Sequence, residues 1–271
     1  MHEEETQTIF EKSQEGQHAY SLPKSVEDFH QYSPPKAFQR QETIPLAEIS
    51  EIDLTRHFTS LSRRNMGIDT HFYPLGSCTM KLNPRVNEYC AAIPAFARSH
   101  PLAADEFVQG NLQLIHSLIE ELCQVTRMEA GTLASNAGAQ GEFAGLQMIR
   151  AYHASREDTQ RNEILVPDDA HGTNPASACM AGFKIIPIRT HDEGQLCLDH
   201  LQEVVSEKTA GLMLTNPNTL GLFHKGIKEV ARIVHQSGGL LYYDGANLNA
   251  ILNVSQPGEM GFDVMHINLH K

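Results

Sequence analysis

Two side chains near the end of this 271-residue sequence have the types and spacing that one kind of covalent chemistry requires. Asp244 closes an apolar run that starts at Gly239, and Lys271 lies 27 positions (271 − 244) further on. A lysine amine can hold an aldehyde as a Schiff base, and a carboxylate against a pyridine nitrogen keeps that nitrogen protonated, so that the ring accepts electrons from a breaking bond. This pair therefore indicates pyridoxal 5'-phosphate as a cofactor, held by Lys271 and Asp244.

The interval between the two residues has room for the elements that would bring them together. A strand can end at Asp244, a loop can pass through Pro257 and Gly258, and a return strand can place Lys271 beside the first strand. A strand-end aspartate and a strand-end lysine are common on their own, however, and a helix cap with a solvated lysine is the simpler alternative. The rest of the sequence has to decide between the two interpretations.

Short apolar runs alternate with helical patterns over the second half of the chain. The expected strands are residues 164–167, 183–188, 211–215 and 240–243, and the expected helices between them are 173–182, 198–207 and 226–237. Such alternation predicts an α/β fold with a mostly parallel, doubly wound sheet flanked by helices. Ligands of these sheets bind beyond the carboxyl ends of the strands.

Three polar loops follow expected strands at that edge of the sheet. His171 is expected to stack on the pyridine ring, although a histidine that caps the next helix is the alternative. Thr215 and Asn216 are expected to reach the ring hydroxyl or the substrate, whereas an Asn-Pro turn needs no function. Asn247 and His270, which neighbour the aspartate and the lysine in the sequence, are expected as further cofactor contacts.

A run of small residues from 134 to 142 leads into an expected helix over residues 143–152. Small residues let the backbone approach an anion closely, and a helix that starts there directs unpaired N–H groups and a positive dipole end towards it. We assign Ala137, Gly138, Ala139 and Gln140 to the cofactor phosphate. Tight packing explains such a run equally well when it stands alone.

Composition and charge exclude several classes of protein. The formal charge of −12 argues against a nucleic-acid or anionic-membrane partner, and no apolar run approaches the length of a membrane span. The start of the chain has neither a signal-peptide nor a transit-peptide pattern, so a cytoplasmic protein is expected. The five cysteines have no CxxC spacing and the histidines form no HExxH motif, so we expect neither a disulfide framework nor a metal site.

The first part of the chain divides into an arm and a helical segment. Residues 1–45 are polar and rich in proline, which predicts an extended arm that wraps a partner subunit or forms a disordered tail. Residues 46–104 are expected to hold a helix near 49–61 and a loop that lines the site. The α/β cofactor domain is expected over residues 105–271, beginning with a helix whose apolar stripe within 105–126 packs in the core.

The stretch from Asp69 to Pro84 resembles the YPLGSCTMKxNP segment of the glycine decarboxylase family, the P-proteins of the glycine cleavage system. The segments AGAQGE, DDAHGTNPASA, TNPNTLGLF, YYDGAN and GFDVMHINLHK resemble motifs of the same family, in the same order. The resemblance covers nearly the whole chain after residue 45 and is greatest for the cofactor-bearing subunit 2 of the two-subunit form. It implies the aspartate-aminotransferase-like large domain of fold-type-I pyridoxal enzymes, with Lys271 as the Schiff-base lysine, Asp244 as the pyridinium partner and His171 as the stacking residue.

The resemblance also implies a reaction and its partners. A pyridoxal-dependent glycine dehydrogenase (aminomethyl-transferring), an oxidoreductase, decarboxylates glycine and transfers the aminomethyl group to the lipoamide of the H-protein. The expected partners are glycine, the lipoylated H-protein and a companion subunit 1 in a heterotetramer. The family segment makes Ser77, Cys78, Thr79 and Lys81 candidates for the substrate site.

The sequence departs from the family pattern at two positions and at its end. Leu82 stands where the family usually has tyrosine, and Ser135 stands where it often has proline. Family members continue past the lysine with a glycine-rich segment and a smaller domain, which implies that this chain is C-terminally truncated and puts its activity in doubt. Another fold-type-I enzyme, such as a cysteine desulfurase with Cys78 as the accepting thiol, and an inactive partner subunit are the alternatives. The YPLGSCTMK segment disfavours the first and Lys271 the second.

Overall fold

The computed structural model describes residues 7–20, 34–42, 44–67, 70–71 and 83–269, which belong to two compact units, Met1–Tyr73 and Pro74–Lys271. The first unit contains a short 3-10 helix, η1 (Lys36–Phe38), and the helix α1 (Glu51–Arg63). The Ser50 side chain caps α1 by accepting a hydrogen bond from the Asp53 N–H at 3.2 Å. The helix predicted near 49–61 is therefore confirmed.

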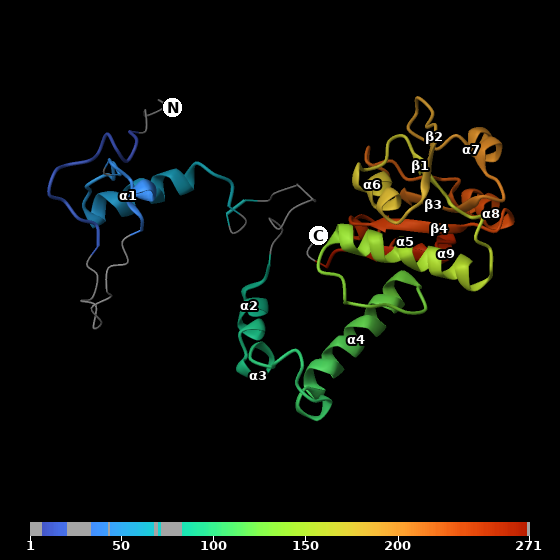
Figure 1. The fold of residues 1–271 in the computed structure, drawn as a ribbon, viewed down its shortest axis with the longest axis horizontal. Coiled ribbons are helices and arrows are strands. Elements are labelled where there is room, and N and C mark those ends of the chain that lie inside the picture. The colour runs from blue at the N-terminus through green and yellow to red at the C-terminus, as the bar shows by residue number, and fades with distance from the viewer. Residues whose placement is uncertain (1–6, 21–33, 43, 68–69, 72–82, 270–271) are drawn as a thin grey trace. The chain divides into compact units, whose positions relative to one another are not determined.

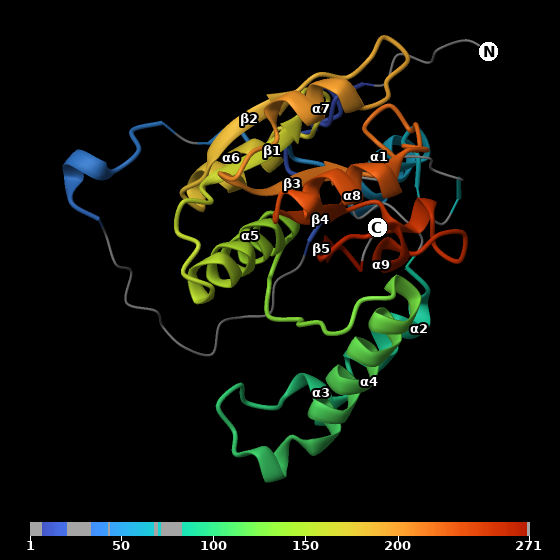
Figure 2. The same ribbon diagram turned by 90° about the vertical axis from the view of Figure 1, so that its right-hand side faces the viewer.

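A five-stranded sheet forms the centre of the second unit (Figure 1). Its strands are β1 (Glu163–Pro167), β2 (Lys184–Ile188), β3 (Thr209–Thr215), β4 (Leu240–Gly245) and β5 (Val264–Ile267). The strand order is β2-β1-β3-β4-β5, as Figure 2 shows, and every neighbouring pair is parallel. The predicted α/β fold with a parallel sheet is confirmed, including the return strand after Asp244.

Helices cover both faces of this sheet. They are α5 (Gly138–Ser155), α6 (Thr173–Met180), α7 (Leu198–Val204), α8 (Ile227–Gln236) and the short α9 (Pro257–Met260), with a 3-10 turn, η3 (Leu248–Ala250), after β4. One buried core joins α5 and α6 to the sheet, and a second joins α7, α8 and α9 to its other face. Tyr242 belongs to the first core and Tyr243 to the second, as the alternation of side chains along a strand requires.

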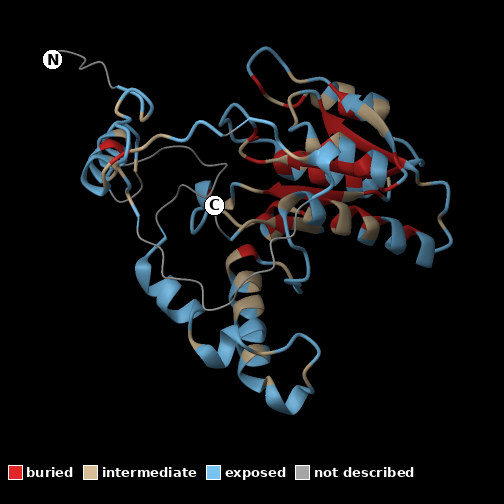
Figure 3. Ribbon diagram, turned by 60° about the vertical axis from the view of Figure 1, so that its left-hand side comes forward, coloured by how far each residue is buried: buried red, intermediate tan, exposed pale blue. Residues whose placement is uncertain are grey.

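The helical segment that precedes α5 has few buried side chains. It contains α2 (Arg85–Ala91), α3 (Pro94–Ala97), a 3-10 turn, η2 (Asp105–Phe107), and α4 (Gln109–Thr126). The predicted helix within 105–126 is confirmed, but the prediction that its stripe packs in the core is wrong. Phe107 is 79% exposed and Leu112 is 43% exposed, and Thr126 is the buried residue of α4 (Figure 3). Helical spacing specifies an apolar face but not the element that covers it.

Across the described residues, none of the helices combines the length and apolar composition that crossing a membrane requires.

Candidate active site

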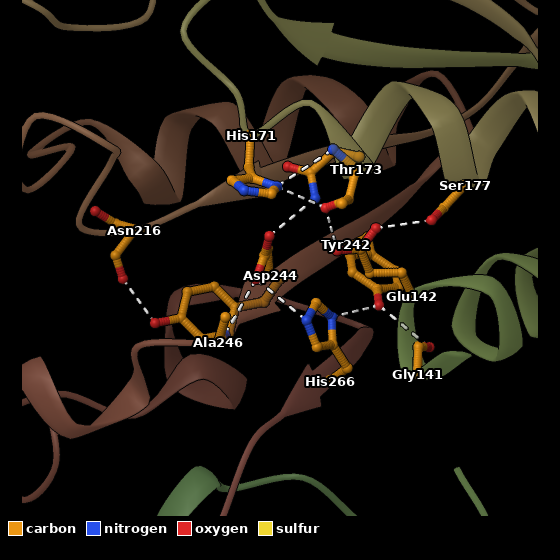
Figure 4. A network of polar contacts seen from close by, with 12 residues as sticks. Gly141, Glu142, His171, Thr173, Ser177, Asn216, Tyr242, Asp244, Ala246 and His266 are labelled. Atoms are coloured by element: carbon orange, nitrogen blue, oxygen red, sulfur yellow. Dashed lines mark hydrogen bonds and ion pairs between the residues drawn. The ribbon is translucent and has the colours of Figure 1, made fainter. Parts of the chain in front are cut away.

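The carboxyl ends of β3, β4 and β5 bring three polar residues into register. Thr215 pairs with Asp244, and Asp244 pairs with His266 on the next strand. The first turn of α5 and the start of α6 lie against the same edge, through contacts described below (Figure 4). This edge of a parallel sheet is where ligands of α/β proteins bind.

Asp244 is a buried carboxylate whose two oxygens both accept hydrogen bonds. The Asn174 side-chain N–H donates to Oδ2 at 2.8 Å, the Ala246 backbone N–H donates to Oδ1 at 3.1 Å, and His266 Nε2 lies 3.2 Å from Oδ1. Burial raises the pKa of Asp244, but the hydrogen bonds from His266, Asn174 and the Ala246 N–H outweigh it and lower the pKa to about 2. The carboxylate is therefore ionised at neutral pH although it is only 4% exposed.

His266 connects Asp244 to a buried phenol. Its Nδ1 lies 2.8 Å from the hydroxyl of Tyr242, which also lies 3.4 Å from the Gly141 carbonyl on α5. Burial raises the pKa of Tyr242, so this phenol keeps its proton. A Cβ on Gly141 would stand 3.0 Å from the His266 Cβ, and one on Gly145 would stand 2.5 Å from the Tyr242 ring. The small residues of α5 thus allow the helix to pack closely on these two side chains.

A second buried carboxylate, Glu142, lies next to the first. It accepts hydrogen bonds from Thr173 Oγ1 at 2.7 Å and from Ser177 Oγ at 2.8 Å, both on α6. One ligand atom each of Glu142, Asp244 and His266 lies within 4.8 Å of the others. All three have hydrogen-bond or ion-pair partners within the protein, so the cluster is a connected polar network.

The exposed His171 contacts this network through Thr173. Its Nδ1 lies 2.7 Å from Thr173 Oγ1, which donates to Glu142, and 3.2 Å from the Thr173 backbone N–H at the start of α6. Contact with that N–H is what a helix cap would make, and the residue is exposed. The stacking role of His171 stays a prediction.

The residues assigned to the phosphate form the first turn of α5, which begins at Gly138 and not at 143. No side chain of the described residues caps this helix, since its N-cap is Ala137. Gln140 Oε1 accepts a hydrogen bond from the Asn136 N–H at 2.9 Å, and a Cβ on Gly138 would lie 3.1 Å from Asn268 Oδ1. A cavity of about 540 Å³ adjoins this turn, with Gly138, Gly141, His266 and Asn268 in its wall.

Other predicted residues lie in different surroundings. Asn216 is fully buried, where its Oδ1 accepts from the His224 N–H at 2.9 Å and its backbone carbonyl accepts from Tyr243. Asn247 is exposed at the start of η3. Six predicted residues lie outside the described residues, namely Ser77, Cys78, Thr79, Lys81, His270 and Lys271. Their roles stay predictions.

Sequence reasoning missed four residues of the polar network around Asp244. They are Glu142, Asn174, Tyr242 and His266. Each lies inside a segment that the motifs had already marked, but as part of a strand or a helix. An available indication was the spacing of Tyr242 and Asp244, because residues two apart on a strand face the same side of a sheet.

The second half of the chain matches a known family model, aminotransferase class-V, over residues 140–271. The whole chain is 52% identical to the probable glycine dehydrogenase (decarboxylating) subunit 2 of Caldanaerobacter subterraneus subsp. tengcongensis over 277 aligned positions, which cover 56% of that protein. It is also 52% identical to the protein of the same description from Staphylococcus saprophyticus, covering 97% of this chain and 54% of that protein. The chain thus spans about half the length of the curated relatives it matches.

Two solved structures share the fold. The inhibitor-bound glycine decarboxylase (P-protein) of the glycine cleavage system matches 90% of this chain and 54% of its own, with a TM-score of 0.64 and 20% identity. The sphingosine-1-phosphate lyase of Burkholderia pseudomallei matches 78% of this chain and 50% of its own, with a TM-score of 0.54 and 16% identity. At these identities the likeness concerns the fold alone. The chain is therefore similar to glycine dehydrogenase (decarboxylating) subunit 2 over its whole length, and its residues 140–271 match the aminotransferase class-V model.

Proposed function

We propose that this chain binds pyridoxal 5'-phosphate at the carboxyl edge of its sheet and serves the decarboxylation of glycine, with transfer of the aminomethyl group to a lipoyl group. The observation that carries the proposal is the buried Asp244 carboxylate near the carboxyl end of β4, which accepts hydrogen bonds from Asn174 and the Ala246 N–H and lies 3.2 Å from His266. A buried negative charge is costly unless a cation or donors balance it. A protonated pyridine nitrogen is such a cation.

The residues present fit the cofactor in two further respects. The side-chain oxygen of Asn174 is buried beside Asp244 and has no hydrogen-bond partner among the described residues, so it can accept from a donor on a bound molecule. At the other end, the uncapped first turn of α5 adjoins the cavity and can receive a phosphate at its N–H groups. An anion site and a cation site at one sheet edge match the two charged ends of pyridoxal phosphate.

When bound, pyridoxal phosphate supplies a ring that accepts the electrons released as carbon dioxide leaves glycine. Asp244 would hold the ring nitrogen in its protonated form, and Asn174 and His266 would hold Asp244 in place. The N–H groups of Gly138 and Ala139 would bind the phosphate. His171 is proposed to cover one ring face, and Lys271 is proposed to carry the covalent link.

The relatives support the proposed substrate and one proposed partner. They are probable glycine dehydrogenase (decarboxylating) subunits 2, which supports glycine as the substrate and a companion subunit 1 as a partner. With the electron pair left by the departing carbon dioxide, the aminomethyl carbon would bond to one sulfur of a lipoyl disulfide on the H-protein, while the S–S bond breaks and the other sulfur becomes a thiol.

The cofactor role of Asp244 can be tested by equilibrium binding. Asp244→Asn removes the negative charge that would pair with the protonated pyridine nitrogen. Loss of one member of a buried charge pair typically costs about 2 kcal/mol or more, so the Kd for pyridoxal phosphate should rise by about 30-fold or more. Asp168→Asn is the matched control, because Asp168 is also a strand-end carboxylate but is exposed and bonded to Thr190. Equal affinities of Asp244→Asn and the wild-type chain for the cofactor would refute the proposed site.

A further inference from the structure

We propose that Tyr242 and His266 are positioning residues for Asp244, with the Tyr242 phenol holding the His266 imidazole as the tautomer that carries its proton on Nε2 and donates it to Asp244 Oδ1. The expected effect of these two residues on cofactor binding rests on the proposed function above. The proton arrangement itself rests on the contacts of this chain and on the ionised state of Asp244, without any cofactor.

Strand register places the three side chains in a row. Tyr242 and Asp244 are two residues apart on β4 and so point to the same face, and His266 pairs with Asp244 across β5. All three side chains are at least nine-tenths buried. Their contacts measure 2.8 Å from the phenol oxygen to Nδ1 and 3.2 Å from Nε2 to Oδ1. The row is therefore shielded from water, and its polar atoms depend on one another for partners.

Counting protons along the row assigns the tautomer. The ionised Asp244 can only accept a hydrogen bond, so the proton in the contact with His266 belongs to Nε2. The phenol of Tyr242 has one proton and two acceptors in reach, Nδ1 at 2.8 Å and the Gly141 carbonyl at 3.4 Å. The proposal assigns the phenol proton to the shorter contact, because 2.8 Å is an ordinary length for an O–H hydrogen bond and 3.4 Å is longer than usual. Nδ1 is then an acceptor, and the imidazole is neutral.

A neutral imidazole fixes the carboxylate without cancelling its charge. Oδ1 is held by His266 and the Ala246 N–H, and Oδ2 is held by Asn174. Among the described residues, other titratable groups around this site are Glu142 on α5, within 4.8 Å of the pair, His171 before α6, and Tyr243 on the opposite face of β4. Since His266 adds no positive charge, the full charge of Asp244 remains available to a protonated pyridine nitrogen.

The tautomer can be measured on the whole chain without any cofactor. Two-bond ¹⁵N–¹H correlation spectra of histidine-labelled protein distinguish a protonated ring nitrogen from a bare one, and the His266 signals are those that vanish in His266→Gln. We expect Nε2 protonated and Nδ1 bare at neutral pH. Protons on both nitrogens, or on Nδ1 alone, would overturn the assignment.

Two tyrosine variants test whether Tyr242 is the donor. Tyr242→Phe should shift the His266 Nδ1 signal towards that of a nitrogen without a hydrogen bond. Tyr243→Phe is the matched control, because Tyr243 is equally buried on the same strand but donates to the Asn216 carbonyl on the other face. Equal spectra for the two variants would contradict a special role for Tyr242.

Cofactor binding tests the positioning role. His266→Leu should raise the Kd for pyridoxal phosphate by about 10-fold, and His266→Gln, which keeps a donor, should stay within about 3-fold of the wild-type chain.

If the wild-type chain binds the cofactor and His266→Leu binds it equally well, the positioning role is wrong and the proposed function stands. If the wild-type chain binds no cofactor, the proposed function fails, and the spectra still decide the tautomer. If His266→Leu does not fold, the Kd values of Tyr242→Phe and Tyr243→Phe for pyridoxal phosphate test the positioning role instead.

Discussion

The sheet edge formed by β4 and β5 and the helical segment over residues 84–126 differ in how completely this chain supplies partners for their side chains. At the sheet edge, buried carboxylates, a histidine and a phenol are joined by hydrogen bonds to α5 and α6. In the helical segment, large apolar side chains of α4 remain exposed. The comparison teaches that the polar network around Asp244 can be built from residues 141–266 while a neighbouring amphipathic helix has its apolar face uncovered.

The largest expected difference between the two regions concerns buried leucines. Leu212 on β3 is fully buried, so Leu212→Ala should lower the free energy of unfolding by about 2–5 kcal/mol, because it leaves a cavity in the core. Leu112→Ala on α4 should lower it by about 0.5 kcal/mol or less. Urea denaturation of both variants measures the contrast. A loss of several kcal/mol for Leu112→Ala would show that the α4 face is covered in solution.

A pair of helical glycines sharpens the same comparison. A Cβ on Gly145 of α5 would stand 2.5 Å from the Tyr242 ring, so Gly145→Ala should destabilise the chain by about 1–3 kcal/mol through overpacking. A Cβ on Gly110 of α4 would have its nearest neighbour at 3.9 Å, so Gly110→Ala should be neutral or slightly stabilising. Thermal unfolding tests the pair, and opposite signs for the two changes are the expected result.

Acid should act on the sheet edge through Asp244. Its pKa falls from an ordinary value of 3.8 to about 2 on folding, so the ionised carboxylate stabilises the folded chain above pH 3.8. This contribution, about 2 kcal/mol, is lost as the pH falls from about 4 to about 2. The difference in unfolding free energy between the wild-type chain and Asp244→Asn should shrink over that window. A difference that does not change with pH would mean that Asp244 is not held as an ion.

Local patterns in the sequence predicted the sheet and part of the site. Apolar runs and their spacing were sufficient for β1 to β4, and a strand-end carboxylate was sufficient for Asp244. The start of α5 was predicted five residues too late (143 − 138), because the small residues there suggested a loop and yet form the first helical turn.

The remaining features depend on contacts between distant residues. Tyr242 and His266 are 24 positions apart, and Glu142 and Ser177 are 35 apart, so their pairing follows from strand register and helix packing. No local period predicts such pairs. The apolar stripe of α4 shows the converse, because its period predicted a covered face that this chain does not provide.

Borohydride reduction of the purified chain with pyridoxal phosphate, followed by peptide mapping, tests the central claim most directly. Reduction converts a link between a lysine and the cofactor into a stable amine that mass spectrometry can locate. The proposed site predicts one modified peptide, the one that contains Lys271, and a much weaker yield from Asp244→Asn. Modification spread over surface lysines, or none at Lys271 under saturating cofactor, would contradict the claim that this sheet edge holds pyridoxal phosphate.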